Sequence, residues 1–195
     1  MGKRVVDVAL SLLGVLVLGV CYGPIAIAIR LDTPGPVIYR QQRIGLGGKP
    51  FTIYKFRSMV AQADRLKALV KNEASGQIFK NQNDPRITRV GRFLRSTSLD
   101  ELPQLINVLR GEMSLVGTRP PTAEEVAAYQ PHHLQRLRVK PGLTGEWQVR
   151  GRSSVSNFDR IVQMDLAYQR KWSLAYDLRL LVKTVGVVLN RQGAY

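Results

Sequence analysis

Residues 8–29 form a run of 22 residues without a charged side chain, and this run limits the folds that are open to the chain. As one straight helix it would be about 33 Å long, which matches a bilayer hydrocarbon core of about 30 Å. The run is too long for the apolar region of a signal peptide, and no small-residue cleavage site accompanies it. A buried core helix would be shorter and polar on one face. The run therefore predicts a membrane segment.

Gly23 and Pro24 interrupt this segment. Proline removes a helix hydrogen bond and clashes with the preceding turn, so we expect the helix to kink or break at this pair. The arm before the break would be only about 24 Å long, too short to cross a bilayer. Basic residues flank both ends of the run, and basic flanks favour the cytoplasmic side. A re-entrant helix satisfies both flanks, whereas a kinked span must export Lys3 and Arg4, so composition favours re-entry slightly and leaves both topologies open.

Positive charge dominates the chain, which has 29 Lys and Arg against 14 Asp and Glu, a net charge of +15. Such a balance predicts an anionic partner: a nucleic acid, an acidic membrane face or a phosphorylated substrate.

The single cysteine, Cys21, excludes an internal disulfide. His132 and His133 are adjacent, without an acid or a cysteine at ligand spacing, and we expect them to be solvated.

The remaining sequence predicts an α+β fold that is mostly helical with a few short strands. Glycine and proline turns at residues 33–36 and 45–50 flank two short strands, which indicates a hairpin. Further helices are expected from apolar spacing at residues 59–74, 158–172 and 174–189.

Thr122 and Glu125 have the spacing of a capping box, so another helix should begin there and extend to about residue 130. The apolar run and the rest of the chain then separate into two parts. We expect a re-entrant membrane helix at residues 1–31 and a membrane-associated domain at residues 32–195.

Two adjacent acids, Asp100 and Glu101, precede Pro103. Proline is tolerated only in the first turn of a helix, so a helix should begin between residues 99 and 102 with both acids at its N-terminal end. Simple capping is one interpretation. The other is a phosphate-handling site, because adjacent carboxylates can bind Mg²⁺ and a carboxylate can attack phosphorus. Arginines and Lys55 in the neighbouring sequence suit phosphate oxygens.

Long stretches of the chain resemble the bacterial sugar transferases, the monotopic polyprenol-phosphate phosphoglycosyl transferases. They are the proline-broken apolar helix, "GPVIYRQQRIGLGGKPFTIYKFRSM", "DPRITRVGRFLRSTSLDELPQLINVLRGEMSLVGTRP", "KPGLTGEWQVRGR" and "WSLAYDLRLLVKTV" with the closing "GAY". The resemblance covers essentially the whole chain, which looks like the minimal catalytic form of the family.

The resemblance implies a reaction. A UDP-sugar gives its sugar 1-phosphate to undecaprenyl phosphate, UMP leaves, and undecaprenyl-diphosphate-sugar forms as the first membrane step of polysaccharide or glycoconjugate synthesis. By resemblance Asp100 is the nucleophile that carries the phosphosugar in a ping-pong mechanism, and Glu101 helps to hold Mg²⁺. The family's membrane segment is a re-entrant helix broken at the position of Gly23-Pro24, which places a monotopic protein on the cytoplasmic face of the bacterial inner membrane.

The resemblance also implies roles for other residues of this chain. Lys55 and Arg57 resemble phosphate contacts, although a salt bridge within the fold is the alternative for Arg57. Arg95 resembles an arginine near the lipid phosphate, and Arg119 an arginine near the nucleotide phosphates. Asp177 matches a family acid, and an ion pair is the alternative role for it.

Two other functions compete with the enzyme. A membrane-tethered nucleic-acid binder would fit the charge, but the chain has no helix-turn-helix, RNA-binding or zinc-finger signature and only 7% aromatic residues. A noncatalytic membrane scaffold would tolerate the loss of the Asp100 carboxylate. We therefore expect UDP-sugar, undecaprenyl phosphate and membrane lipids as partners, no nucleic acid, and a possible homo-oligomer; the sugar is not specified by the sequence.

Overall fold

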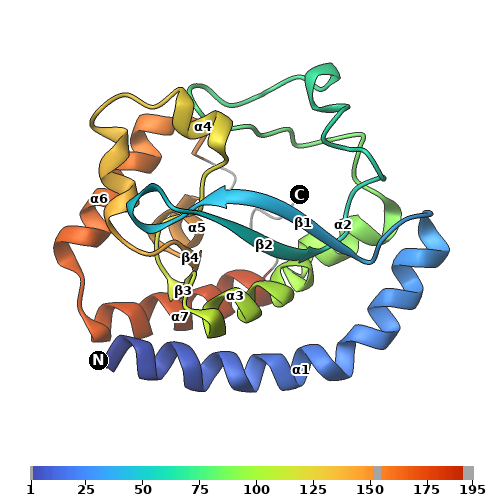
Figure 1. Ribbon diagram of the computed structural model, residues 1–195, viewed down its shortest axis with the longest axis horizontal. Coiled ribbons are helices and arrows are strands. Elements are labelled where there is room, and N and C mark those ends of the chain that lie inside the picture. The colour runs from blue at the N-terminus through green and yellow to red at the C-terminus, as the bar shows by residue number, and fades with distance from the viewer. Residues whose placement is uncertain (1, 152–154, 191–195) are drawn as a thin grey trace.

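A computed structural model describes residues 2–151 and 155–190 of the chain (Figure 1). Its elements confirm the expected α+β class, with helices dominating over four short strands. The α-helices and strands are α1 (Gly2–Asp32), β1 (Ile38–Ile44), β2 (Pro50–Phe56), α2 (Arg89–Ser96), α3 (Leu105–Arg110), β3 (Ser114–Val116), α4 (Ala123–Ala127), β4 (Gly142–Thr144), α5 (Glu146–Gly151), α6 (Phe158–Lys171) and α7 (Leu174–Leu189). Short 3-10 helices are η1 (Leu46–Gly48), η2 (Lys67–Leu69), η3 (Leu99–Gln104) and η4 (His133–Arg138).

Helix α1 forms the outer edge of the molecule and contains the apolar run. The helix continues through Pro24, so of the two expected alternatives the break at Gly23-Pro24 is not present. Figure 1 shows α1 changing direction in its second half, which agrees with the expected kink, since a bend is the usual consequence of a proline inside a helix. The missing hydrogen bond is tolerated because the turns on either side keep their own.

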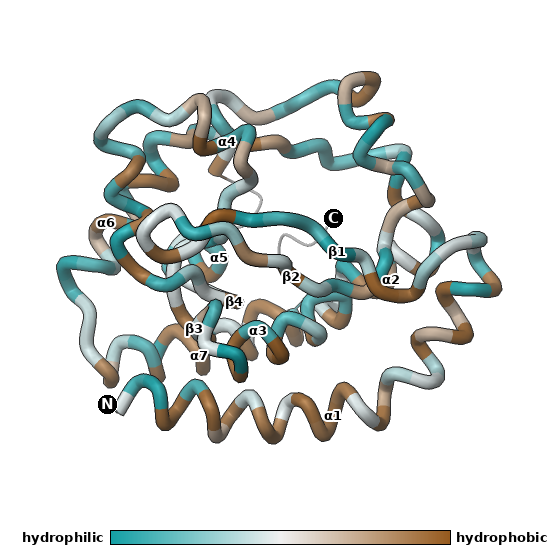
Figure 2. Tube along the Cα trace, in the orientation of Figure 1, coloured by the Kyte–Doolittle hydropathy of each residue, from teal (hydrophilic) through white to brown (hydrophobic). Residues whose placement is uncertain are grey.

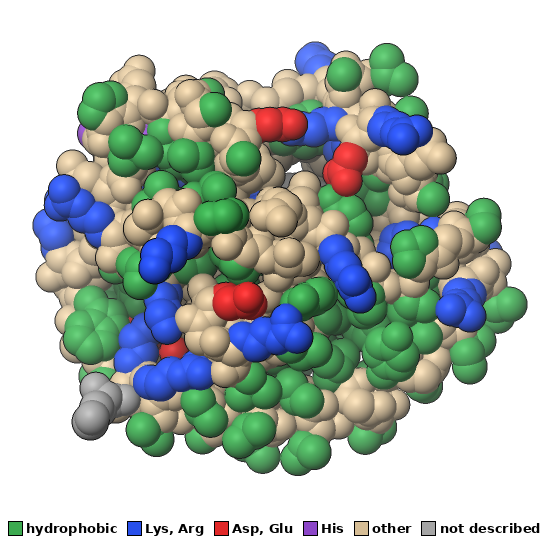
Figure 3. All heavy atoms as spheres, in the orientation of Figure 1, with side chains coloured by type: hydrophobic (Ala, Val, Ile, Leu, Met, Phe, Trp, Pro, Cys, Tyr) green, Lys and Arg blue, Asp and Glu red, His purple; other side chains and the backbone are tan. Residues whose placement is uncertain are grey.

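Most of the apolar surface of α1 faces outward. It is the one helix in the described part of the chain that is long and apolar enough to cross a membrane. Figure 2 shows it as a mostly hydrophobic rim, and Figure 3 shows the hydrophobic side chains along that rim. The exposed large apolar residues on this helix are Val5, Leu10, Leu12, Leu13, Leu16, Val17, Val20, Tyr22, Ile27 and Leu31.

The inner face of α1 packs on the rest of the protein. Leu18, Ile25 and Ile29 join a buried cluster with residues of β2 and α2. At Gly14 an added Cβ would lie 2.5 Å from Cδ1 of Leu105 on α3. A larger residue at this position would therefore require the Leu105 side chain to move.

Polar contacts hold both ends of α1 to the same globular domain. At the start, Lys3 Nζ donates to Val116 O at 2.9 Å and Arg4 donates to Val108 O at 2.6 Å. At the end, Arg57 donates to Thr33 O at 2.6 Å, and the backbone N–H of Val90 donates to Asp32 at 2.9 Å.

Two small sheets position the site. The predicted hairpin is confirmed: β1 and β2 pair antiparallel, with Ile38 opposite Phe56 and Ile44 opposite Pro50. Strands β3 and β4 pair in parallel, and Gly142 approaches so closely that an added Cβ would lie 2.0 Å from the backbone nitrogen of Gly117. This contact brings the segment after β3 alongside β4.

One predicted helix is absent. Residues 59–74 form turns and the single 3-10 turn η2. Gln62 has a left-handed backbone with φ of 67°, and Leu66 and Leu69 remain 39% and 81% exposed. The apolar spacing in this segment therefore has no surface to pack against, and tertiary packing is the usual source of a short helix's stability.

Candidate active site

The two acids lie in the first turn of η3, as the proline predicted. Ser98 precedes this turn in a left-handed conformation with φ of 56°, and Pro103 lies inside it. The turn is a 3-10 helix that leads into α3, rather than an α-helix from the start. Ser98 makes no side-chain capping bond, and the Thr97 hydroxyl donates to Phe93 O at 2.8 Å at the end of α2. Neither hydroxyl caps η3. The acids can therefore cap this turn and also have the functional role.

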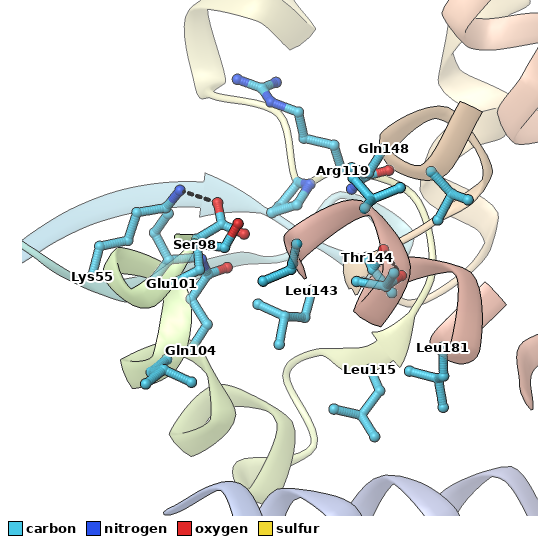
Figure 4. A pocket seen from close by; sticks show the side chains of 18 of the residues that line it. Lys55, Ser98, Glu101, Gln104, Leu115, Arg119, Leu143, Thr144, Gln148 and Leu181 are labelled. Atoms are coloured by element: carbon cyan, nitrogen blue, oxygen red, sulfur yellow. Dashed lines mark hydrogen bonds and ion pairs between the residues drawn. The ribbon is translucent and has the colours of Figure 1, made fainter. Parts of the chain in front are cut away.

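A pocket of 460 Å³ opens beside η3. Figure 4 shows Lys55 and Glu101 on one side and Gln148, Thr144 and Leu181 on the other. The charged side chains of its wall are Arg43, Lys55, Glu101 and Arg119, and the rest of the wall is neutral and mostly apolar. The pocket is therefore suited to an anionic ligand with a neutral portion.

The two acids occupy different positions relative to this pocket. Glu101 lines the pocket, and Lys55 Nζ donates to its Oε1 at 2.7 Å. Asp100 is only 6% exposed and is not part of the lining, although its neighbours Leu99 and Glu101 both are. The structure thus brings Lys55 and Glu101 together and keeps Asp100 in the wall behind them.

Two arginines and one glutamate form the basic end of the pocket. Arg119 donates to Glu125 at 3.1 Å, and Arg43 lies 3.9 Å from the same carboxylate. Burial, followed by the charge of Arg119, lowers the pKa of Arg43 to about 10. Although burial alone would raise the pKa of Glu125, Arg119 holds it below its usual value. One carboxylate thus faces two guanidinium groups, an arrangement that favours a further anion.

Lys80 lies over the ring of Trp147, with Nζ 4.9 Å from the ring centroid. Burial, followed by the charge of Arg119, lowers the pKa of Lys80 to about 8. Sequence reasoning missed both Lys80 and Arg43, because no local pattern in the sequence distinguishes them from the many other basic residues. Their only signal was the overall excess of positive charge.

Lys80 does not line the pocket and donates to Val155 O at 2.6 Å, but its neighbour Trp147 does line it, so we expect the charge of Lys80 to act on a bound anion from a distance. A bound diphosphate would favour charged Lys80, so the affinity for UDP should stay constant below pH 8 and weaken as the pH rises from 8 to 9, where the free protein loses this charge. Titration calorimetry across pH 7–9 measures it. Lys80→Arg, which keeps its charge, should remove this inflection; an unchanged inflection in that variant would assign it to another group.

The structure gives Arg57 and Asp177 roles away from the pocket. Arg57 is 5% exposed and does not line the pocket, and its guanidinium binds carbonyls at the end of α1. Asp177 accepts a hydrogen bond from Lys3 at 2.6 Å and one from Tyr168 at 2.7 Å. Asp177 therefore forms an ion pair, and its partner is Lys3.

The structure also places three further polar residues. Arg95 lies in the last turn of α2 and is not part of the pocket lining. Glu146 is buried and accepts the Tyr176 hydroxyl at 2.6 Å. His133 is 2% exposed rather than solvated, and its Nε2 lies 2.8 Å from Asp159.

His132, His133 and Asp159 are close enough to hold a metal ion. However, His133 Nδ1 accepts the backbone N–H of Gln130 at 3.1 Å. Nδ1 therefore carries no proton, and Nε2 of the neutral ring must carry it and donate to Asp159. A metal would need that nitrogen's lone pair, so this cluster is a hydrogen-bonded clamp between η4 and α6.

The carboxylate oxygens of the acid pair are of the donor type that Mg²⁺ binds. Carboxylate oxygens are hard ligands, and Mg²⁺ commonly uses one or two of them and completes its shell with water and substrate phosphate. Glu101 offers such an oxygen at the pocket wall, and Asp100 is the adjacent residue. Both residues would hold the ion together with phosphate oxygens of a ligand.

Several known proteins have sequences similar to this one. The family described as bacterial sugar transferase matches residues 1–191. The chain belongs to this bacterial sugar transferase family. The match includes α1, the acid pair and every residue of the pocket lining, while the "GAY" segment at the end of the chain and Arg152 lie outside the described residues.

Relatives within the bacterial sugar transferase family carry specific names. The chain is 45% identical to the galactosyl transferase CpsE of Streptococcus agalactiae over 98% of this chain and 43% of that protein. It is 51% identical to the undecaprenyl-phosphate galactose phosphotransferase of Salmonella typhimurium over 83% of this chain and 35% of that protein. It is 41% identical to the UDP-glucose:undecaprenyl-phosphate glucose-1-phosphate transferase of Escherichia coli over 99% of this chain and 41% of that protein. The chain thus spans less than half the length of these relatives.

Proposed function

We propose that this protein transfers a sugar 1-phosphate from a UDP-sugar to undecaprenyl phosphate and releases UMP. The observation that carries the proposal is the pocket, which combines Glu101, Lys55 and Arg119 beside η3 with a neutral wall. Its charged wall suits a diphosphate, and its neutral wall suits the uncharged parts of a nucleotide sugar. The names of the relatives, with galactose or glucose phosphate as the transferred group, support the same reaction.

We assign the nucleophile to Asp100. Its carboxylate oxygen would form a bond to the β-phosphorus, and the bond from that phosphorus to the bridging oxygen would break, so that UMP takes the electron pair. An oxygen of undecaprenyl phosphate would then attack the same phosphorus and release the Asp100 carboxylate. The reaction is therefore ping-pong, with one phosphosugar carried on the protein between the two steps.

The cations of the pocket and Glu101 support these steps. Arg43 and Arg119 would hold the nonreacting phosphate, and Lys55 would neutralise charge on the phosphate that is attacked. Glu101 would exchange its contact with Lys55 for a role in holding Mg²⁺. When bound, that ion supplies charge neutralisation on the diphosphate and on the leaving UMP.

Incubation of the protein with Mg²⁺ and a set of UDP-sugars, without lipid, tests this function. One equivalent of UMP should appear per protein, and a phosphosugar should remain on Asp100. Undecaprenyl phosphate added afterwards should release it as the lipid product. UMP formation only in the presence of lipid, with every UDP-sugar tried, would contradict the ping-pong order.

We also propose that α1 enters and leaves the membrane on the cytoplasmic face. A straight helix of 31 residues would be about 46 Å long, so a spanning arrangement would separate its ends by more than the bilayer core. The contacts of Lys3 and Arg4 at one end, and of Arg57 at the other, instead tie both ends to one domain. A span would break the first set of contacts and place their charges on the far side.

Cysteine accessibility distinguishes the two topologies. In a Cys21→Ala background, Gly2→Cys and Leu31→Cys place a thiol at each end of α1, and Leu69→Cys, at an 81% exposed position, marks the domain. An impermeant maleimide should label all three variants in inverted vesicles and none in spheroplasts. Labelling of Gly2→Cys, but not Leu69→Cys, in spheroplasts would establish a spanning helix.

A further inference from the structure

Three residues of the pocket wall hold buried polar atoms that lack a hydrogen-bond partner. They are Gln104 Nε2, Trp147 Nε1 and Gln148 Oε1, and no partner for them exists within residues 2–151 and 155–190. These three account for half of the six such atoms found in that part of the chain. Gln104 is 3% exposed and Trp147 is 6% exposed, so bulk water does not compensate either side chain.

A buried N–H or C=O without a partner destabilises a fold, and most native proteins avoid it. When several occur on the wall of one pocket, a ligand that pairs with them explains why they persist. The buried groups at Ser11, Arg57 and Asn81 lie elsewhere and do not line this pocket.

The three groups approach the pocket from two sides. Gln104 ends η3, three residues after Glu101, and Figure 4 shows its side chain beneath Glu101 and Ser98. Trp147 and Gln148 lie on α5, and Figure 4 shows Gln148 across the pocket from Glu101. The portion of a ligand that reaches all three must therefore lie between the acid pair and α5.

The charge of this region defines the ligand portion. The amide and indole groups are neutral, in contrast to the Arg43, Lys55 and Arg119 that surround them. The orphaned atoms comprise two N–H donors and one carbonyl acceptor, so they require a neutral group that both accepts and donates hydrogen bonds. Hydroxyl groups do both, whereas an apolar polyprenyl chain does neither.

We infer that Gln104, Trp147 and Gln148 form the subsite that binds the hydroxyl groups of the donor's sugar, an inference that rests on the proposed function. The sugar is bonded to the phosphate that reacts, so it must lie within one phosphate of the acid pair, where Gln104 is.

The uracil base fits this subsite less well. Its polar edge is a flat acceptor–donor–acceptor array, which needs coplanar partners on one side. The three groups here come from two opposing elements, η3 and α5. The indole of Trp147 also has one face covered by Lys80, which limits stacking on a base. A sugar ring, with hydroxyls directed outward around its edge, meets partners on both sides.

Substitutions that remove each orphaned group test the subsite. They are Gln104→Met, Trp147→Phe and Gln148→Met. Because the orphaned atoms have no partner without ligand, Gln104→Met and Gln148→Met should keep or raise the melting temperature of the ligand-free protein. Trp147→Phe also removes buried ring volume and should lower the melting temperature, so this variant is judged by binding alone. Trp172→Phe is the matched control, since its indole N–H is paired with Asp177 at 3.0 Å and lies outside the pocket. This control should lower the melting temperature and leave sugar binding unchanged.

Binding is measured with Mg²⁺ in an Asp100→Asn background, so that the donor stays intact. Each pocket variant should weaken the binding of UDP-glucose or UDP-galactose by a factor of about 5 to 30 and leave the affinity for UDP within about twofold. Equal losses for UDP and the UDP-hexose would overturn the inference and assign the three residues to the nucleotide. Unchanged binding of both ligands would also overturn it.

Failure of the proposed function gives a different result. In that case the parent protein itself would bind neither UDP nor any UDP-hexose, and the inference would fall with it.

Discussion

Asp100→Asn is expected to abolish both the lipid-free release of UMP and the transfer to undecaprenyl phosphate, with a rate loss of roughly four to six orders of magnitude. The amide is nearly the same size as the carboxylate but is a far weaker nucleophile toward phosphorus. Mass spectrometry of the protein after incubation with Mg²⁺ and the active UDP-sugar measures the adduct, and nucleotide chromatography measures UMP. No phosphosugar should be found on this variant.

Glu101→Gln is the matched comparison, because it makes the same chemical change one residue away. If Glu101 holds the metal and does not attack, this variant should lose about two to three orders of magnitude in rate and still form the adduct on Asp100. Fragmentation of the tryptic peptide between Arg95 and Arg110 places the phosphosugar on one acid. An adduct on Glu101 in the parent protein would reverse the assigned roles, and this outcome is a real alternative in geometry because Glu101 lines the pocket and Asp100 does not.

Local sequence rules predicted several elements well. The capping box at Thr122 and Glu125 forms as expected, with the Thr122 hydroxyl accepting the N–H of Glu125 at 3.1 Å. The helices expected at residues 158–172 and 174–189 correspond to α6 and α7. The start of η3 follows from Pro103 alone. In each case the signal depends on residues within one or two turns, so it is present in the sequence itself.

Nonlocal contacts were not predictable in the same way. Lys55 and Arg57 are two residues apart, a spacing that places side chains on one face of a strand. Strand β2 ends at Phe56, so Arg57 instead turns to the end of α1, while Lys55 remains at the pocket. Arg43 comes from the other strand of the hairpin, and only the pairing of β1 with β2 brings it to the same wall.

The charges in the first turns of α1 indicated which side of the membrane its start prefers, but their count did not show what they contact. Lys3 and Arg4 were treated only as flanking charges of a membrane segment. In the structure, Arg4 binds the carbonyls at the end of α3, and Lys3 binds Asp177 on α7. Asp7, one turn further along α1, accepts the Ser114 hydroxyl at 2.9 Å. These three residues join α1 to the rest of the domain. Their contacts favour a re-entrant topology, because a spanning helix would break them.

Arg136→Met is expected to cause the largest loss of stability, because it leaves a buried carboxylate without its partner. Arg136 and Asp165 are 2% and 1% exposed, and Nε lies 2.7 Å from the carboxylate. Breaking such a pair from one side costs about 3–5 kcal/mol. For a protein of this size the melting temperature should fall by about 6–20 °C. Thermal unfolding in detergent measures this, with Arg160→Met, the same change at an exposed arginine of α6, as the control for a small change.

The same substitution should weaken UDP binding, since Arg136 supports the basic end of the pocket. Its guanidinium donates to the carbonyl of Arg119 at 3.4 Å, and the substitution removes this contact. The bond from the Thr118 hydroxyl goes to the backbone carbonyl of residue 136 and is kept. The double variant Arg136→Met/Asp165→Leu separates the two effects. Removing both charges should restore most of the stability, because two apolar side chains replace a buried ion pair at little cost. Affinity for UDP should stay low, because the support for the Arg119 segment is still missing. Recovery of both properties in the double variant would show that Arg136 acts on the pocket only through global stability.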